Sequence, residues 1–197
     1  MSLFFNSDID QLSKPGEVVD VVMTASFDIP GVFNGARLES FKSIEEFIPK
    51  MKSGDNRLFF SDGSWSNYEL MEYLLQISGP ALVGFTTWSI SEIGITRMNE
   101  WVQQGQIIDL YAVLDVGIRN RKPHIYQQAI ATLKNLKLTH CHAKVLSIVS
   151  PDISFLVVGS ANFTKNPRKE AGVIICSRES ADFSFNWIKT IVDGSSS

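Results

Sequence analysis

The feature that most restricts the fold of this chain is a regular alternation of strand and helix patterns between residues 57 and 138. Short apolar runs predict strands at 57–60, 81–90 and 107–116. Apolar residues spaced three or four positions apart predict helices at 67–77, 91–103 and 124–135. Strands that alternate with helices favour an α/β fold with a largely parallel sheet.

The last third of the chain adds strands that no helix separates. They are expected at 138–150, 154–162 and 171–177, ahead of a closing helix at 180–192. Short connections between neighbouring strands imply antiparallel pairing. The complete sheet is therefore predicted to be mixed. Near the start of the chain, the pattern predicts a strand at 18–27 and a short helix at 43–51, for which Ser43 and Glu46 would form a capping box.

These patterns suggest an N-terminal extension over residues 1–56, one domain over 57–193 and a flexible tail over 194–197. With 197 residues, of which 44% are hydrophobic and 20% charged, the chain can bury one core. No apolar run approaches the ~18 residues that span a bilayer. The first residues show no signal-peptide pattern, and two cysteines cannot make a disulfide framework. A cytoplasmic protein without stable membrane association is expected.

Positive charge is concentrated in one part of the chain. The net charge is −3 overall, whereas residues 1–115 carry −9 and residues 116–170 carry +7. All three histidines lie in the basic stretch. The chain as a whole is therefore not a generic polycation. The basic stretch is either ordinary solvated surface charge or a local electropositive surface for a phosphate-bearing partner.

Polar residues that suit phosphate chemistry fall on two neighbouring predicted strands. Alternation along the first strand places His140, His142 and Lys144 on one face. If the loop between the strands has three residues, Lys144 faces Ser160 and His142 faces Asn162 in an antiparallel hairpin. A shift of the register by one residue would move the paired groups to opposite faces.

These residue types fit a phosphoryl-transfer site. Lys144 is a compact cation, and Ser160 and Asn162 are neutral hydrogen-bond donors for the non-bridging oxygens of a phosphate. His142 can attack phosphorus or move a proton, because imidazole titrates near neutral pH. Glu170 is the nearest carboxylate downstream and is the candidate to orient an imidazole through its second nitrogen.

The order of these residues resembles the HKD motif of the phospholipase D superfamily. His142-Ala143-Lys144 is followed by the run GSANFT at 159–164 and by Glu170 ahead of an apolar strand. A histidine and a lysine at this spacing are a weak signal by themselves, but the following run at the matching distance makes the signal strong.

The resemblance implies a phospholipase D-like mixed β-sheet with helices on both faces, and an active site where two HKD motifs meet. In that family one histidine forms a phosphohistidine and the other protonates the leaving group, without a metal or another cofactor. Carried over to this sequence, His142 is the nucleophile or general acid, and Lys144 and Asn162 bind phosphoryl oxygens. Ser160 supports them, and Glu170 orients a histidine.

The motif departs from the family pattern in two places. Val149 stands where the family has an aspartate five positions after the lysine, and Asp152 lies three residues further on, in the predicted turn. Arg168 stands where the family often has an asparagine. Candidates to bind the flanking phosphates of a polymeric substrate are Lys165 and Arg168, together with Arg119, Arg121 and Lys122; ordinary solvated loop charge is the alternative for these residues.

The sequence contains one such motif, so a complete site requires a second copy of the chain. An isologous homodimer through the active-site face would supply it. In size and motif number the chain resembles the short bacterial endonucleases of the superfamily. We therefore expect a metal-independent phosphodiesterase that hydrolyses nucleic acid, with DNA favoured over RNA. The alternatives are a phospholipid hydrolase or phosphatidyl transferase, and a nucleic-acid-binding module without catalysis.

Other interpretations of the same residues have less support. His140 is expected to be a residue at the edge of the site, because its neighbours do not match the family pattern. A metal site is disfavoured because adjacent strand residues point to opposite faces and Lys144 would repel a cation. Ser160 lacks the surrounding G-x-S-x-G pattern of a serine hydrolase. Trp88, at the end of a predicted strand, is a core residue or lines a cleft.

Overall fold

The computed structural model describes residues 32–37, 44–48, 50–63, 65–165 and 167–194. The strands within these ranges are β1 (Val32–Arg37), β2 (Asp55–Ser61), β3 (Ala81–Thr87), β4 (Ile107–Asp115), β5 (Asn135–Thr139), β6 (Val145–Val149), β7 (Phe155–Gly159) and β8 (Glu170–Ile175). The helices are α1 (Ile44–Phe47), α2 (Asn67–Ser78), α3 (Glu92–Gln103), α4 (Ile118–Arg121), α5 (Pro123–Thr132) and α6 (Arg178–Asp193).

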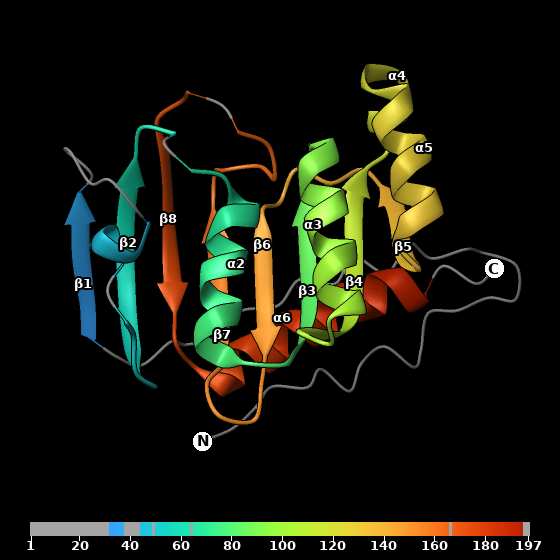
Figure 1. Ribbon diagram of the computed structural model, residues 1–197. Helices are drawn as coiled ribbons and strands as arrows, with labels where there is room; N and C mark the ends of the chain where they lie inside the picture. The colour runs from blue at the N-terminus through green and yellow to red at the C-terminus, as the bar shows by residue number, and fades with distance from the viewer. Residues whose placement is uncertain (1–31, 38–43, 49, 64, 166, 195–197) are drawn as a thin grey trace, which may run out of the picture.

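The strands form one mixed sheet in the order β1-β2-β8-β7-β6-β3-β4-β5 (Figure 1). The strands β3, β4 and β5 are parallel, and β6 pairs antiparallel with β3. The pairs β6–β7, β7–β8 and β8–β2 are antiparallel as well. As a result, the carboxyl ends of β2, β3, β4, β5 and β7 lie at the same edge of the sheet as the first residues of β6 and β8. This edge, at the top of Figure 1, is called the carboxyl edge below.

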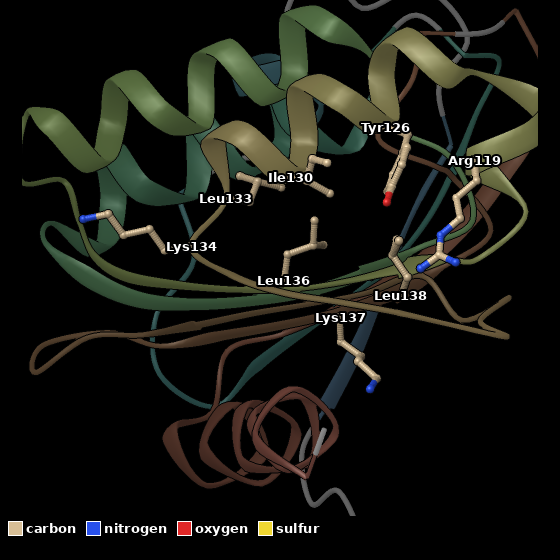
Figure 2. Close-up of a pocket in the computed structure, with 8 residues that line it drawn as sticks. All are labelled: Arg119, Tyr126, Ile130, Leu133, Lys134, Leu136, Lys137 and Leu138. Carbon is tan, nitrogen blue, oxygen red and sulfur yellow. The ribbon is translucent and has the colours of Figure 1, made fainter. Parts of the chain in front are cut away.

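Helices cover both faces of the sheet. The helices α2, α3 and α5 lie on one face and α6 lies on the other (Figures 1 and 2). The main core fills the space between the sheet and the first group of helices, with Leu70, Leu74, Phe85 and Ile95 fully buried. The sequence-based prediction of a mixed sheet flanked by helices on both faces is confirmed.

Serine caps set the starts of three helices. Ser66 and Glu69 form a capping box at α2, and the Ser91 hydroxyl accepts a hydrogen bond from the backbone of Gly94 at α3. Ser177 does the same for Ser180 at α6. Each cap satisfies a backbone N–H that the first helical turn leaves without a partner. The helix starts expected after Ser66 and Ser91 are confirmed.

The single strand predicted at 138–150 is wrong. Two strands, β5 and β6, occupy this stretch, and β3 and β4 lie between them in the sheet. Three inter-strand steps span about 14 Å, and six residues of extended chain reach about 20 Å. Residues 140–144 must therefore be nearly extended to cross the carboxyl edge, which is why their sequence looks like a strand.

The predicted register of the following hairpin is also wrong. Val145 pairs with Val158 and Ile148 with Phe155, so the turn holds one residue more than the expected three. The Ser154 hydroxyl closes this turn by accepting from the Ser150 N–H at 3.1 Å and donating to its carbonyl at 3.0 Å. Lys144 consequently lies opposite Gly159, not Ser160, and the Gly159 N–H donates to the Lys144 carbonyl.

Some expectations concern parts of the chain outside the described residues. They are the strand at 18–27, the capping role of Ser43 and most of the tail. Residues 32–37 belong to the predicted N-terminal extension, and they pair with β2 in the same sheet. The division at residue 56 remains a prediction. Within the described ranges, none of the helices has the length and apolar character needed to cross a membrane.

Candidate active site

The candidate site residues lie along the carboxyl edge. His142 is in the segment that crosses this edge from β5 to β6, and Lys144 comes directly before β6. Ser160 and Asn162 follow β7, and Glu170 is the first residue of β8. The mixed topology thus brings together residues that the sequence places on three separate segments.

The crossing segment is tied to each strand that it passes. Asp115, at the end of β4, accepts a hydrogen bond from the Cys141 N–H on Oδ2 at 3.2 Å. Thr86 of β3 donates from its hydroxyl to the Ala143 carbonyl at 3.0 Å and accepts from the Val145 N–H at 3.1 Å. His142 lies between these two attachments. The side chains of β3 and β4 therefore replace the sheet hydrogen bonds that this segment lacks.

His142 is exposed and stands next to an aromatic wall. Its ring centroid is 6.3 Å from that of Trp88, which follows β3. The Arg121 guanidinium stacks on the Trp88 ring, with its central carbon 3.8 Å from the ring centroid. It also donates a hydrogen bond to the Trp88 carbonyl at 2.9 Å. Arg121 also forms an ion pair with Asp115 at 2.9 Å. These contacts connect the backbone of the crossing segment to the imidazole through Asp115, Arg121 and Trp88.

Two charged side chains are buried in the described part of the chain, and both flank His142. Lys144 is 7% exposed and Asp115 is 9% exposed. Buried charges are costly unless they are paired, and they cluster at functional sites. Burial alone would raise the pKa of Asp115, but the hydrogen bonds from Arg121 and from two backbone N–H groups lower it below its usual range.

Lys144 points toward the crossing segment. Its ammonium donates to the His142 carbonyl at 2.6 Å. Burial lowers the pKa of this lysine below its usual range, while the charges of Cys141, Glu170 and Asp115 act in the opposite direction. An ammonium held in this way keeps further hydrogen-bond donors for a ligand.

Ser160 and Glu170 form one unit across the β7–β8 pair. The Ser160 hydroxyl donates to Glu170 Oε2 and accepts from the Ala171 N–H at 3.0 Å. Close approach of the two strands makes this possible, because a Cβ on Gly159 would stand 2.8 Å from the Ala171 carbonyl oxygen. Within the described residues, no hydrogen bond joins Glu170 to His142.

The side-chain amide of Asn162 keeps its nitrogen available as a hydrogen-bond donor. The Thr87 hydroxyl lies 3.1 Å from Asn162 Oδ1 and shares its proton with the Ser89 carbonyl at 2.9 Å. Orientation of the oxygen toward Thr87 leaves the NH₂ group as a donor. Asn162 also follows Ala161, whose carbonyl accepts from the Asn67 side chain of α2 at 2.5 Å.

The remaining predicted residues lie further from these contacts. Lys165 is exposed and pairs with Glu69 at 3.6 Å, and Arg168 is exposed. Val149 is buried beneath α6, and Asp152 is exposed in the β6–β7 turn, at the opposite edge of the sheet. Asp152 therefore does not occupy the place of the family aspartate.

Sequence reasoning assigned no role to Asp115 or Thr86. A carboxylate at the end of a largely apolar strand was one signal for Asp115, and Thr86 gave no comparable signal. Arg121, a sequence-based candidate for the flanking phosphates, pairs with Asp115 and stacks on Trp88. The described residues hold no cluster of three or more His, Cys, Asp or Glu that could bind a metal ion.

Comparison with known proteins supports the fold. No protein-family model and no curated protein matches the chain. Among solved structures, Nuc from Salmonella typhimurium, a phospholipase D family member, matches over 70% of this chain and 93% of its own, with 16% identity and a TM-score of 0.50. Polyphosphate kinase from Porphyromonas gingivalis matches over 71% of this chain and 26% of its own, with 12% identity and a TM-score of 0.52. NucT from Helicobacter pylori matches over 70% and 95%, with 17% identity and a TM-score of 0.49.

The chain therefore has a phospholipase D-like fold, as its motif led us to expect. At these identities the likeness is one of fold. The chemistry of the site has to be argued from the residues at the carboxyl edge.

Proposed function

We propose that this protein is a metal-independent phosphodiesterase that hydrolyses nucleic acid, with DNA favoured, through a phosphohistidine on His142. One observation carries the proposal. The exposed His142 lies on the segment whose backbone the buried Lys144 ammonium binds, at an edge where Asn162 and the Ser160–Glu170 pair also end, in a phospholipase D-like fold. Lys144 and Asn162 would hold the non-bridging oxygens of the phosphate.

The reaction would proceed in two displacements at phosphorus. In the first, a nitrogen of His142 attacks phosphorus, the P–N bond forms and the P–O bond to the leaving group breaks. The leaving oxygen takes a proton from a second imidazole. In the second, that imidazole accepts a proton from water, the water oxygen bonds to phosphorus and the P–N bond breaks. Lys144 and Asn162 stabilise the charge that develops on the phosphoryl oxygens in both steps.

The second imidazole would come from His142 of the partner subunit in a homodimer. Neither His140 nor His124 makes a described contact with the Lys144, Asn162 or Glu170 side chains. A two-fold axis through the carboxyl edge would give each imidazole one of the two roles. Glu170, held by Ser160, is then available to orient an imidazole across the interface.

The charge of the site region favours a polyanion over a zwitterionic lipid. The stretch 116–170 carries a net charge of +7, and Lys165 and Arg168 lie on the exposed connection after β7. We assign to these two residues contacts with phosphates that flank the scissile one. Pairing with Glu69 limits the contribution of Lys165.

The test is a cleavage assay with chelator present on single-stranded DNA, duplex DNA, RNA and phospholipid vesicles. We expect DNA cleavage, and a loss of at least about 10³-fold for His142→Ala. Alkaline quenching followed by mass spectrometry should find a nucleotide adduct on the peptide that contains His142. Ser150→Ala, at the opposite edge of the sheet, is the control.

Other outcomes would identify the alternatives. Tight DNA binding without cleavage, unchanged by His142→Ala, would indicate a binding module. Turnover of vesicles without cleavage of DNA would indicate a lipid enzyme. Cleavage that survives His142→Ala would contradict the assignment of the nucleophile.

A further inference from the structure

A groove of about 340 Å³ lies between α5 and the edge strand β5 (Figure 2). Its lining combines apolar and polar side chains. The apolar ones are Ile130 from α5, Leu133 directly after α5, and Leu136 and Leu138 from β5. Ile130 is 47% exposed, although an isoleucine on a helix that packs on a sheet is usually covered. The groove is therefore an accessible, partly apolar surface beside β5, the last strand of the sheet in the described part of the chain.

One end of the groove carries an aromatic ring and a cation. Tyr126 points into the groove, and the Arg119 guanidinium lies 5.6 Å from the centre of its ring. Lys134 stands at the other end, while Lys137 points to the opposite side of the sheet (Figure 2). The described residues that line the groove include no aspartate or glutamate. The lining thus carries cations and no carboxylate.

The groove begins close to the candidate active site. Leu138 is the penultimate residue of β5, and His142 lies four positions further along the chain. Even a fully extended segment of that length spans only about 14 Å. A chain of a few nucleotides whose phosphate is bound at His142 can therefore reach the groove.

We propose that this groove binds a base of a single-stranded polynucleotide during the activity proposed above. The apolar side chains of the groove and the Tyr126 ring offer the flat contacts that an unstacked base uses. Arg119 and Lys134 lie where phosphates on either side of that base would need cations. A base paired and stacked within a duplex cannot enter a groove between a helix and a strand. The inference rests on the proposed function and adds to it a preference for single strands.

A peptide strand added to the edge of β5 is the competing occupant. The two cations without a facing carboxylate favour the polyanion. A substitution that places a charge in the groove separates the two occupants. If a second copy of the chain pairs with β5, the charge would disrupt this self-association without changing the affinity for oligonucleotides.

The experiment measures the affinity of fluorescent oligo(dT) and of a duplex of equal length by anisotropy. The His142→Ala protein is used so that the probes stay intact. Ile130→Glu places a carboxylate in the groove, and Phe183→Glu adds the same charge at a residue of similar exposure, 42%, on α6 across the sheet. We expect Ile130→Glu to weaken oligo(dT) binding about tenfold. Phe183→Glu should leave it unchanged, and the duplex should bind equally to all three proteins.

A scan of the oligonucleotide with abasic positions locates the bound base. One or two abasic positions should reduce the affinity of the parent protein, and these positions should have no further effect in Ile130→Glu. Equal losses of affinity for the single strand and the duplex would show that the added charge acts only by electrostatic repulsion, and this would overturn the proposal. Unchanged oligo(dT) affinity in Ile130→Glu would also overturn the proposal. If the particle mass of this variant falls at the same time, a second copy of the chain occupies the edge of β5 instead.

Failure of this inference can be told apart from failure of the proposed function. Bis(p-nitrophenyl) phosphate is too small to occupy the groove and His142 together. If the wild-type protein hydrolyses it with chelator present while Ile130→Glu binds oligo(dT) normally, only the groove assignment is wrong. If the wild-type protein hydrolyses neither this ester nor DNA, the proposed function is wrong.

Discussion

At the scale of single residues, Asp115 is the group on which the position of His142 depends. It holds the crossing segment through the Cys141 N–H and fixes Arg121, whose guanidinium stacks on Trp88 beside the imidazole. None of these groups needs to touch a phosphate. A reacting atom displaced by a fraction of an ångström lowers the rate while substrate affinity stays similar.

Asp115→Asn tests this role. The amide keeps the shape of the side chain but loses the ion pair with Arg121, so we expect kcat to fall about tenfold to a hundredfold with little change in KM. Loss of charge-assisted hydrogen bonds should cost about 1–3 kcal/mol of stability near neutral pH. The pKa of Asp115 is lower in the folded protein than its ordinary value, so this stability is present above pH 4 and is lost as the pH falls below that value.

Urea unfolding of both proteins between pH 3 and pH 7 measures the effect, and the difference should shrink toward the acid end. Asp152→Asn removes an exposed carboxylate from the β6–β7 turn and is the matched control. A parallel fall in kcat and rise in KM for Asp115→Asn would instead assign Asp115 a direct part in binding.

At the scale of elements, most strands and helices could be predicted, but the paths between them could not. Local periodicity marks a strand or helix, and it found β3, β4, α2, α3 and α6 to within a few residues. The error at 138–150 has a different cause. Whether an extended segment pairs in a ladder or crosses other strands depends on the strand order, which is a property of the whole sheet.

For the candidate site as well, the candidate residues could be predicted from the sequence, but their arrangement could not. The pattern on the crossing segment and after β7 predicted His142 and Asn162 as site residues, and the family resemblance suggested their roles. Their expected pairing across a hairpin is wrong because Ser150 and Ser154 close a longer turn. The residues converge because two antiparallel strands start where the parallel strands end, which no local pattern encodes.

The contact between β7 and β8 offers a test at this scale. In Gly159→Ala the new Cβ would meet the Ala171 carbonyl oxygen, so the strands must separate and Ser160 must move relative to Glu170. We expect a loss of about 1–3 kcal/mol in stability together with lower activity. Gly54→Ala is the control, because it strains a positive φ of 93° at the opposite edge of the sheet and should reduce stability alone. Full activity in Gly159→Ala would show that the Ser160–Glu170 unit is not required.

At the scale of the whole molecule, the single motif predicts that activity is a property of two copies. If each site needs His142 from both subunits, a dimer of one wild-type chain and one His142→Ala chain is inactive. After random exchange of subunits, activity should then fall with the square of the wild-type fraction. A linear fall would mean that each subunit carries a complete site. The measurement needs differently tagged chains, exchange by co-expression, and the particle mass of the mixture. A monomeric mass for a fully active protein would contradict the shared site, because a monomer contains one copy of His142.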